Sequence, residues 1–330
     1  MSHRLPCPLT TGRLACLLCS LLCSVLPEST GAAEAAFDYA LQPQTVAPGI
    51  YAFIGKREDF STVNGGNIVN TGFIVGTDGI LVIDSGPSRR YGEQMRAAIT
   101  QTSPLPLRQV FNTHHHPDHF LGNQAFADIP RLALASTRQG IVTEGNAFAE
   151  NLYRLAGDWM QGTEADIPDA LQATGRILLA GRPLRLLALH GHTAGDLAIY
   201  DETTGVLFAG DLVFHQRAPT TPHANIERWL ASLETLEAIT REPGFHALVP
   251  GHGPISHDAG PIRQTRAWLF WLMQTMRTAA AAGLDMNEIW QQPLPDAFKD
   301  MPLGQREFQR SVGHLFPAAE QEALDHGHAH

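Results

Sequence analysis

The sequence predicts an α/β fold made of two similar halves, packed sheet to sheet with helices on the outside. Short apolar runs such as residues 80–83 and 206–209 are typical of buried strands. Residues 89–100 and 225–239 instead repeat their apolar side chains at helical spacing. Along the chain the order is strands, helices, strands, helices, which favours two layers of sheet covered by two layers of helix.

The first 35 residues are typical of a secretory signal peptide. Arg4 and Arg13 are positive, residues 14–26 are mostly apolar, and an Ala-x-Ala cleavage site ends at Ala35. The apolar run is shorter than the about 20 residues of a membrane span, although an uncleaved anchor is the alternative. We therefore expect a periplasmic or secreted protein that is not inserted in a membrane after cleavage.

Composition excludes several kinds of chemistry. The formal net charge is -10, which disfavours nucleic-acid partners because those need a basic surface. The chain has four cysteines, and all lie in the predicted signal segment: Cys7, Cys16, Cys19 and Cys23. A mature chain that begins at Ala36 would have no disulfide, no cysteine nucleophile and no thiolate ligand.

In the first half, residues 37–46 read as a linker. We then expect a helix at 89–100 and strands at 49–54, 72–75, 80–83 and 107–111. Asp84 directly follows the strand at 80–83. Two roles are open for its carboxylate: capping a loop, or orienting a metal-ligating histidine.

In the second half, residues 120–126 begin a helix and 132–135 form a short strand. Residues 136–170 are predicted to be a helical insertion, which is either a lid or a plain packing helix. Strands return at 176–179, 184–189, 197–200, 206–209 and 246–249. Helices follow at 225–239, where Asn225 is a suitable N-cap, and at 261–282. We expect a core domain at 45–260 and a C-terminal helical segment at 261–330, ending in a tail with His326, His328 and His330.

The most informative stretch is H-x-H-x-D-H at residues 114–119, immediately after the strand at 107–111. It places four metal-binding side chains close together: His114, His116, Asp118 and His119. Imidazole and carboxylate ligands suit zinc best, and iron or manganese can also use them. The alternative is a solvated histidine-rich loop.

Three more candidate ligands, His192, Asp211 and His252, lie in glycine-rich or turn-like connections beside predicted strands. Seven ligands are too many for one tetrahedral ion, but they suit two ions that share a carboxylate. We assign His114, His116 and His192 to one metal. Asp118, His119 and His252 are assigned to the other, and Asp211 bridges the two.

These motifs resemble the metallo-β-lactamase superfamily, in the H-x-H-x-D-H stretch and around His192, Asp211 and His252. The resemblance covers about residues 45–260 and implies a four-layer αββα sandwich with a binuclear zinc site. Many zinc β-lactamases carry a cysteine at the position of Asp211, so this chain looks more like glyoxalase II-type hydrolases. The overall sequence, including residues 211–217, also resembles the quinoprotein relay system zinc metallohydrolases.

We therefore expect an exported, two-zinc hydrolase of a small ester, thioester, lactone or related substrate. A hydroxide shared by the metals would attack the substrate, and Asp118 would orient it. His215 and His223 are candidates for the pocket wall or for contacts behind the ligands. The alternatives are a cysteine-free β-lactamase and a non-catalytic metal-binding accessory protein, partnered with a periplasmic quinoprotein oxidation system.

Overall fold

The computed structural model describes residues 37–327, with side chains up to Asp325. The predicted signal segment (1–35) and the side chains of the predicted histidine tail (His326, His328 and His330) lie outside the described residues. Within residues 37–327, no helix combines the length and apolar composition needed to cross a bilayer.

The first sheet has 7 strands in the described chain, in sequential order from β1 to β7. The pairs from β1 to β4 are antiparallel, and those from β4 to β7 are parallel. The strands are β1 (Gln44–Ala47), β2 (Ile50–Phe53), β3 (Thr71–Val75), β4 (Ile80–Ile83), β5 (Leu107–Phe111), β6 (Arg131–Ala133) and β7 (Asp169–Ala170).

The second sheet has 5 described strands, in the order β12-β11-β10-β9-β8. The pair of β11 and β12 is parallel, and the other pairs are antiparallel. The strands are β8 (Gly175–Leu179), β9 (Arg182–Leu189), β10 (Asp196–Asp201), β11 (Val206–Phe214) and β12 (Ala247–His252). All residues of β10, β11 and β12 are buried, as expected for strands covered on both faces.

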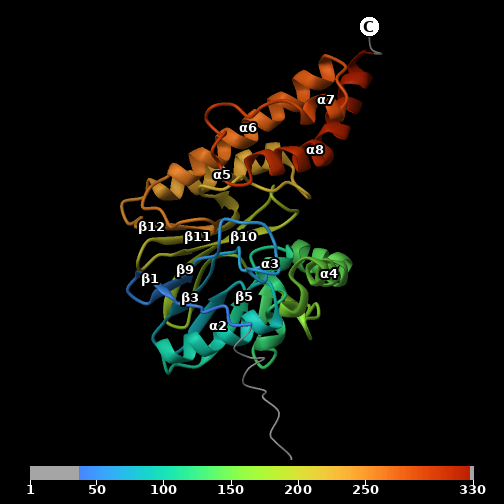
Figure 1. The fold of residues 1–330 in the computed structure, drawn as a ribbon. Coiled ribbons are helices and arrows are strands. Elements are labelled where there is room, and N and C mark those ends of the chain that lie inside the picture. Colours follow the sequence, from blue (N-terminus) through green and yellow to red (C-terminus); the bar gives the residue numbers. More distant parts are fainter. Residues whose placement is uncertain (1–36, 328–330) are drawn as a thin grey trace, which may run out of the picture. The chain divides into compact units, whose positions relative to one another are not determined.

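Helices cover the outer face of each sheet (Figure 1). On the first sheet they are α2 (Arg89–Thr102), α3 (Pro117–Phe120), α4 (Ala135–Ala156) and the 3-10 turns η1 (Asn123–Phe126) and η2 (Gly157–Met160). On the second they are α5 (Ile226–Thr240) and α6 (Gly260–Ala281), while α8 (Gly304–Gly327) packs against α6 and α7 (Met286–Trp290) packs against α8. The predicted N-cap is confirmed, since the Asn225 side chain accepts from the Arg228 N–H.

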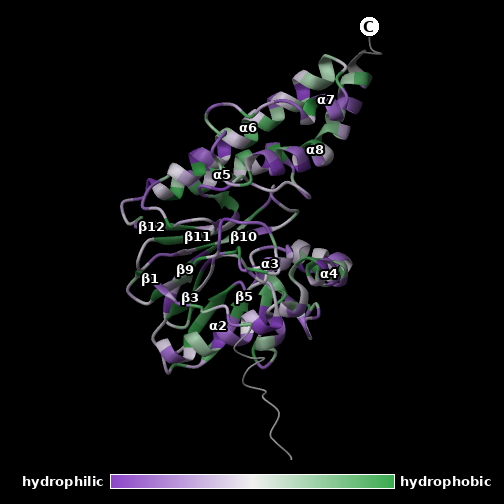
Figure 2. Cartoon of the chain, viewed as in Figure 1, coloured by the Kyte–Doolittle hydropathy of each residue, from purple (hydrophilic) through white to green (hydrophobic). Residues whose placement is uncertain are grey.

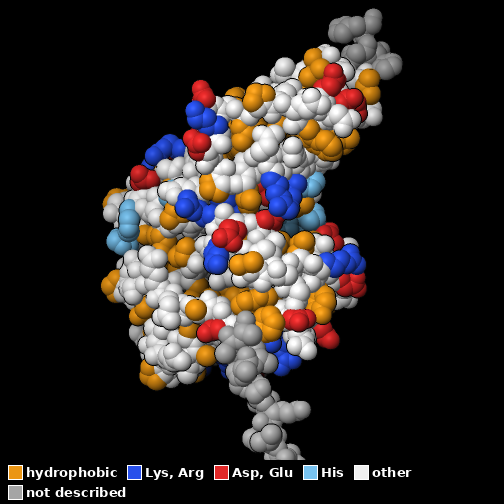
Figure 3. Space-filling model, viewed as in Figure 1, with side chains coloured by type: hydrophobic (Ala, Val, Ile, Leu, Met, Phe, Trp, Pro, Cys, Tyr) orange, Lys and Arg blue, Asp and Glu red, His pale blue; other side chains and the backbone are white. Residues whose placement is uncertain are grey.

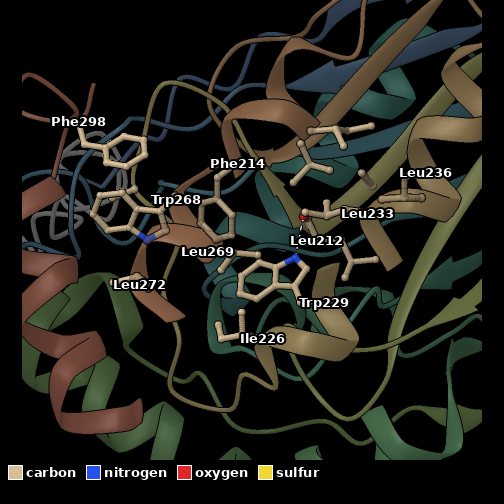
Figure 4. Close-up of a cluster of buried hydrophobic side chains, with 14 of the residues drawn as sticks. Leu212, Phe214, Ile226, Trp229, Leu233, Leu236, Trp268, Leu269, Leu272 and Phe298 are labelled. Carbon is tan, nitrogen blue, oxygen red and sulfur yellow. Dashed lines mark hydrogen bonds between the residues drawn. The ribbon is translucent and has the colours of Figure 1, made fainter. Parts of the chain in front are cut away.

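Three apolar clusters hold the layers together and confirm the αββα sandwich. One lies between the sheets and joins residues such as Ile74 and Phe111 to Ile199 and Val249. A second joins the first sheet to α2 and α4. The third joins the second sheet to α5, α6 and α8 around Trp229 (Figure 4). The apolar colouring of the strands in Figure 2 follows these layers.

Three local predictions were wrong. The segment predicted as a linker contains β1, an edge strand whose mixed polar composition hides its pairing with β2. Residues 120–126 were predicted to begin a helix, but the helix α3 begins at Pro117 and ends at Phe120, and the 3-10 turn η1 follows; proline suits the first helical position. Asp211 and His252 lie in strands and not in loops, since β11 continues to Phe214 and β12 reaches His252.

Residues 136–170, predicted as a helical insertion, contain one long helix and end in a short strand. Helix α4 begins one residue earlier and spans 22 residues, and the segment ends in β7, which extends the first sheet beside β6. Ile141 and Leu152 of α4 are buried in the same cluster as the first sheet. The packing interpretation therefore holds for one face of α4, while other residues of the helix line a pocket described below. The predicted boundary at residue 260 stays a prediction.

Candidate metal centre

The H-x-H-x-D-H stretch leaves the carboxyl end of β5 and turns at once into α3. His114 and His116 lie in the turn, and Asp118 and His119 lie in the single turn of helix that Pro117 begins. All four predicted ligands are at least 94% buried, with exposed fractions of 6% or less. A rigid strand and a short helix thus hold them at one edge of the first sheet.

Three imidazoles converge in a first group. His116 Nδ1 lies 3.0 Å from His114 Nε2 and 2.9 Å from His192 Nε2. On a tetrahedral zinc ion with Zn–N bonds of about 2.0–2.1 Å, ligand nitrogens are about 3.3 Å apart. Asp211 completes this group, with Oδ2 at 3.5 Å from His192 Nε2 and 3.8 Å from His114 Nε2. These four side chains are spaced as ligands of one ion.

A second group lies on the other side of Asp211. It contains Asp118, His119 and His252. The Asp118 Oδ2 atom is 3.4 Å from His252 Nε2 and 3.8 Å from His119 Nε2. Asp211 reaches these imidazoles too: Oδ1 lies 3.1 Å from His119 Nε2, and Oδ2 lies 3.1 Å from His252 Nε2. One buried carboxylate therefore faces both groups.

The hydrogen-bonding state of the site fits metal ligation. His119 Nε2 and Asp211 Oδ1 are buried, yet neither makes a hydrogen bond with good geometry among the described residues. Burial alone would lower the pKa of His119, but the carboxylates of Asp211, Asp84 and Asp118 raise it well above the usual value. In the protein alone, a proton on His119 thus offsets the clustered negative charge, a task that a divalent cation would also perform.

The first group has the protonation state that ligation needs. Burial lowers the pKa of His114 and of His116 well below the usual value, and that of His192 to about 3. These imidazoles are therefore neutral near pH 7. Only a neutral imidazole has a free lone pair for a metal, so no proton must be removed before binding.

Two acceptors fix the second group from behind. Asp84 accepts from the Thr113 N–H at 2.7 Å, from Thr113 Oγ1 at 2.8 Å, and from His119 Nδ1 at 2.7 Å. It does so with a left-handed backbone, φ +57°. His252 Nδ1 donates to the Ile68 carbonyl at 2.7 Å. Both roles considered for Asp84 are thus present: it caps the loop after β5 and it orients His119.

Two glycines make this close packing sterically feasible. Gly251 lies beside Asp211, and a Cβ there would collide with the Asp211 carboxylate. Gly191 has φ +126°, and a Cβ there would collide with the backbone of Trp229. The chain on either side can therefore bring His192 and His252 to the centre only because these positions carry no side chain.

A pocket of about 300 Å³ opens onto the centre, and four candidate ligands line it: His116, Asp118, Asp211 and His252. His223 is also in its wall. His215 is not among the lining residues, and its Nδ1 lies 2.6 Å from the Pro254 carbonyl oxygen. On the face in Figure 3, histidine and Lys or Arg side chains lie next to one another below the C-terminal helices.

Sequence reasoning missed the contribution of α8 to this pocket. Glu307, Arg310 and His314 project from α8 into its wall, together with Arg217. Arg217 is 1% exposed, makes no ion pair within the described chain, and leaves Nε without a partner. Its position in the stretch after Asp211 was a usable signal. For α8, the helical pattern gave no indication of which face would meet the site.

The fold and the two ligand groups are those of a metal-dependent hydrolase scaffold. The chain belongs to the metallo-beta-lactamase superfamily, whose family model matches residues 64–263. The matched segment runs from just before β3 to the start of α6. It includes all seven candidate ligands.

The curated relatives are hydrolases. A hydroxyacylglutathione hydrolase of Synechococcus sp. (strain JA-3-3Ab) is 31% identical over 134 residues, which is 40% of this chain and 45% of that protein. The acyl-coenzyme A thioesterase MBLAC2 of Gallus gallus is 26% identical over 212 residues, 57% of this chain and 73% of that protein. The match thus spans less than half of the first relative.

Among solved structures, a metallo-beta-lactamase from Pontibacter korlensis superposes with a TM-score of 0.56 at 20% identity, covering 70% of this chain and 99% of that one. The metallo-beta-lactamase IND-7 gives a TM-score of 0.55 at 20% identity, with 70% and 98% covered. At this identity the likeness shows the shared fold alone.

Proposed function

We propose that this protein is an exported hydrolase that uses two zinc ions to cleave a small thioester or a related acyl compound. The observation that supports it best is the position of Asp211. Its Oδ1 lies 3.1 Å from His119 Nε2, and its Oδ2 lies 3.1 Å from His252 Nε2 and 3.5 Å from His192 Nε2. A carboxylate shared between two ligand groups suits a site that holds two metal ions close together.

Zinc ions, when bound, lower the pKa of a water molecule and polarise the substrate carbonyl. The chain itself would supply the proton acceptor and the orientation. Asp118 belongs to the second ligand group and also lines the pocket. Its carboxylate is therefore placed to accept a hydrogen bond from the attacking water and to direct that water at the substrate.

The pocket walls favour a substrate with an apolar and an anionic part. Phe148 and Leu155 of α4 form an apolar wall, while Arg217 supplies positive charge. Arg310 is already paired with Asp59 and Glu307, at 2.8 Å each. A buried guanidinium with an unpaired Nε gains most from an anionic ligand, because planar donor pairs match carboxylate and phosphate oxygens. The similarity to a protein named as an acyl-coenzyme A thioesterase supports the thioester class.

Metal analysis of purified, zinc-loaded protein tests the site directly. We expect close to two zinc ions per chain for the wild type. Asp211→Ala should retain one at most and lose hydrolysis, because both ligand groups lose a shared oxygen donor. Asp128→Ala, which removes an exposed aspartate paired with Arg96, is the matched control and should keep two. A wild type that persistently binds one zinc would contradict the bridging role.

A substrate panel separates the competing functions. Acyl-coenzyme A and glutathione thioesters, simple esters, lactones and a chromogenic cephalosporin should be offered to the same preparation. Efficient turnover of the cephalosporin alone would favour the cysteine-free β-lactamase. Failure on the whole panel, together with specific capture of a periplasmic quinoprotein enzyme, would favour the accessory protein. The similarity to quinoprotein relay system metallohydrolases stays a prediction, and N-terminal sequencing of secreted protein would test export.

A further inference from the structure

His116 makes contacts through both of its ring nitrogens. Its Nδ1 faces the first ligand group, at 3.0 Å from His114 Nε2. On the opposite side, His116 Nε2 lies 2.9 Å from His223 Nδ1. His223 continues the chain, with Nε2 at 3.0 Å from Glu144 Oε2. A carboxylate and a second imidazole thus stand in line behind one candidate metal ligand.

The direction of each hydrogen bond in this chain follows from ordinary bonding capacities. If His116 binds a metal through Nδ1, a neutral ring must carry its proton on Nε2. That N–H can only donate, so His223 Nδ1 must accept. A neutral His223 then carries its own proton on Nε2, which donates to Glu144. The carboxylate of Glu144 accepts, so every member of the chain is satisfied.

Three separate segments build the chain of hydrogen bonds. His116 lies between β5 and α3, Glu144 lies in α4, and His223 lies in the connection between β11 and α5. His223 is packed against two further rings, with centroids 4.7 Å from His115 and 6.3 Å from Phe148. These rings hold the imidazole of His223 in place, while the side chains of His223 and Glu144 remain 29% and 36% exposed.

We propose that His223 and Glu144 are positioning residues that fix the tautomer and the ring orientation of His116, so that Nδ1 is always presented to the metal. Through Glu144, helix α4 becomes mechanically coupled to the metal centre. The inference rests on the metal ligation in the proposed function. Helix α4 would then orient a metal ligand, in addition to packing on the sheet and lining the pocket.

A third metal ion among His115, His116 and His223 is the competing interpretation, since their ring nitrogens are close enough to share an ion. It would require His116 to give up its Nε2 proton while Nδ1 holds another metal. The ring would then be an imidazolate, which is a costly form. Hydrogen bonds explain the same distances with neutral rings and one carboxylate.

The test compares variants of the full-length, zinc-loaded protein. His223→Ala removes the acceptor, and His223→Asn restores one oxygen acceptor near the position of Nδ1. Glu144→Ala removes the last acceptor, whereas Glu144→Gln keeps an oxygen that His223 can use. Glu150→Gln is the matched control, since Glu150 is also on α4 but pairs only with Arg154 at the surface.

Zinc affinity, measured by competition with a chromophoric chelator, should fall about 10–100-fold in His223→Ala, the usual effect of losing a partner behind a ligating histidine. We expect His223→Asn to recover part of the loss, Glu144→Ala to bind more weakly than Glu144→Gln, and Glu150→Gln to match the wild type. Equal affinity of all these proteins would overturn the proposal.

The tautomeric states of His116 and His223 provide a second test, because a purely structural role of His223 would not determine which ring nitrogen carries the proton. Long-range ¹⁵N–¹H NMR spectra of ¹⁵N-histidine-labelled, zinc-loaded protein should show His116 and His223 both protonated on Nε2. A proton on His223 Nδ1, or a third zinc ion that is lost in His223→Ala, would contradict the hydrogen-bond chain. A wild type that binds no zinc would refute the metal centre and the positioning role together, whereas normal zinc binding with unchanged variants refutes the positioning role alone.

Discussion

Asp84→Asn probes how far the metal centre depends on a residue that is not itself a ligand. The aspartate accepts three hydrogen bonds, two from Thr113 and one from His119. Asparagine has nearly the same shape but only one oxygen. If that oxygen faces the Thr113 N–H, the amide NH₂ confronts His119 Nδ1; if the side chain flips, the NH₂ confronts the Thr113 N–H instead. At least one buried donor is left without an acceptor in either orientation.

The cost can be estimated from this geometry. An unpaired buried donor costs about 1–3 kcal/mol, and the lost charge-assisted bond to His119 falls in a similar range. The site is fully buried, with Asp84 1% exposed and His119 0% exposed, so water cannot replace the acceptor. We expect the zinc affinity of the second ligand group to fall about 10–100-fold, because orientation and basicity of His119 are both reduced.

Zinc affinity and unfolding by urea should be measured on the same samples. Asp201→Asn is the control, because Asp201 is another fully buried carboxylate at a strand end and its hydrogen bonds go to Thr204, not to a ligand. Both variants should be less stable, but only Asp84→Asn should bind zinc more weakly. Equal zinc affinity in the two variants would refute the reasoning.

Two further predictions concern stability. Trp229 Nε1 donates to the Leu212 carbonyl at 2.9 Å, whereas Trp268 Nε1 has no partner among the described residues (Figure 4). Urea unfolding should therefore show that Trp229→Phe lowers the free energy of unfolding by about 1–3 kcal/mol more than Trp268→Phe; equal losses would contradict this. Burial raises the pKa of Glu307, against the opposing effect of Arg217 and Arg310. The folded state then holds more protons than the unfolded state above about pH 4, so wild-type stability should fall with rising pH relative to Glu307→Gln. Melting temperatures across about pH 4–7 test the sign, and parallel curves would refute it.

The metal ligands could be predicted from the sequence because metals bind a few residue types, and here four of those residues follow one another at short spacing. H-x-H-x-D-H concentrates four metal-binding side chains within six residues after a strand, a pattern with few other physical uses. His192 and His252 sit beside glycines, which signals a close approach of backbone. The structure brings all seven candidates together around Asp211.

The mistakes came where local chemistry and tertiary context disagree. Pro117 cannot continue a strand, which is correct, but the same ring also begins a helix, and only the packing of α3 selects between loop and helix. The polar edge strand β1 has no apolar alternation of its own, so its pairing with β2 depends on the neighbouring sheet. The glycine at 210 suggested that the strand ended before Asp211. Strand β11 instead continues to Phe214, although its pairing with β12 is irregular on both sides of Gly210.

The sequence alone therefore specifies the layers, the ligand types and the absence of cysteine from residues 36–330. These depend on composition and on short-range periodicity. The partners behind the ligands and the wall of the pocket depend on the tertiary structure. Glu144, His223 and Arg310 come from segments with no common motif. Glu144 on α4 contacts His223, and His223 shares the pocket wall with Arg310 on α8. Such contacts join residues far apart in the chain, and no local pattern encodes them.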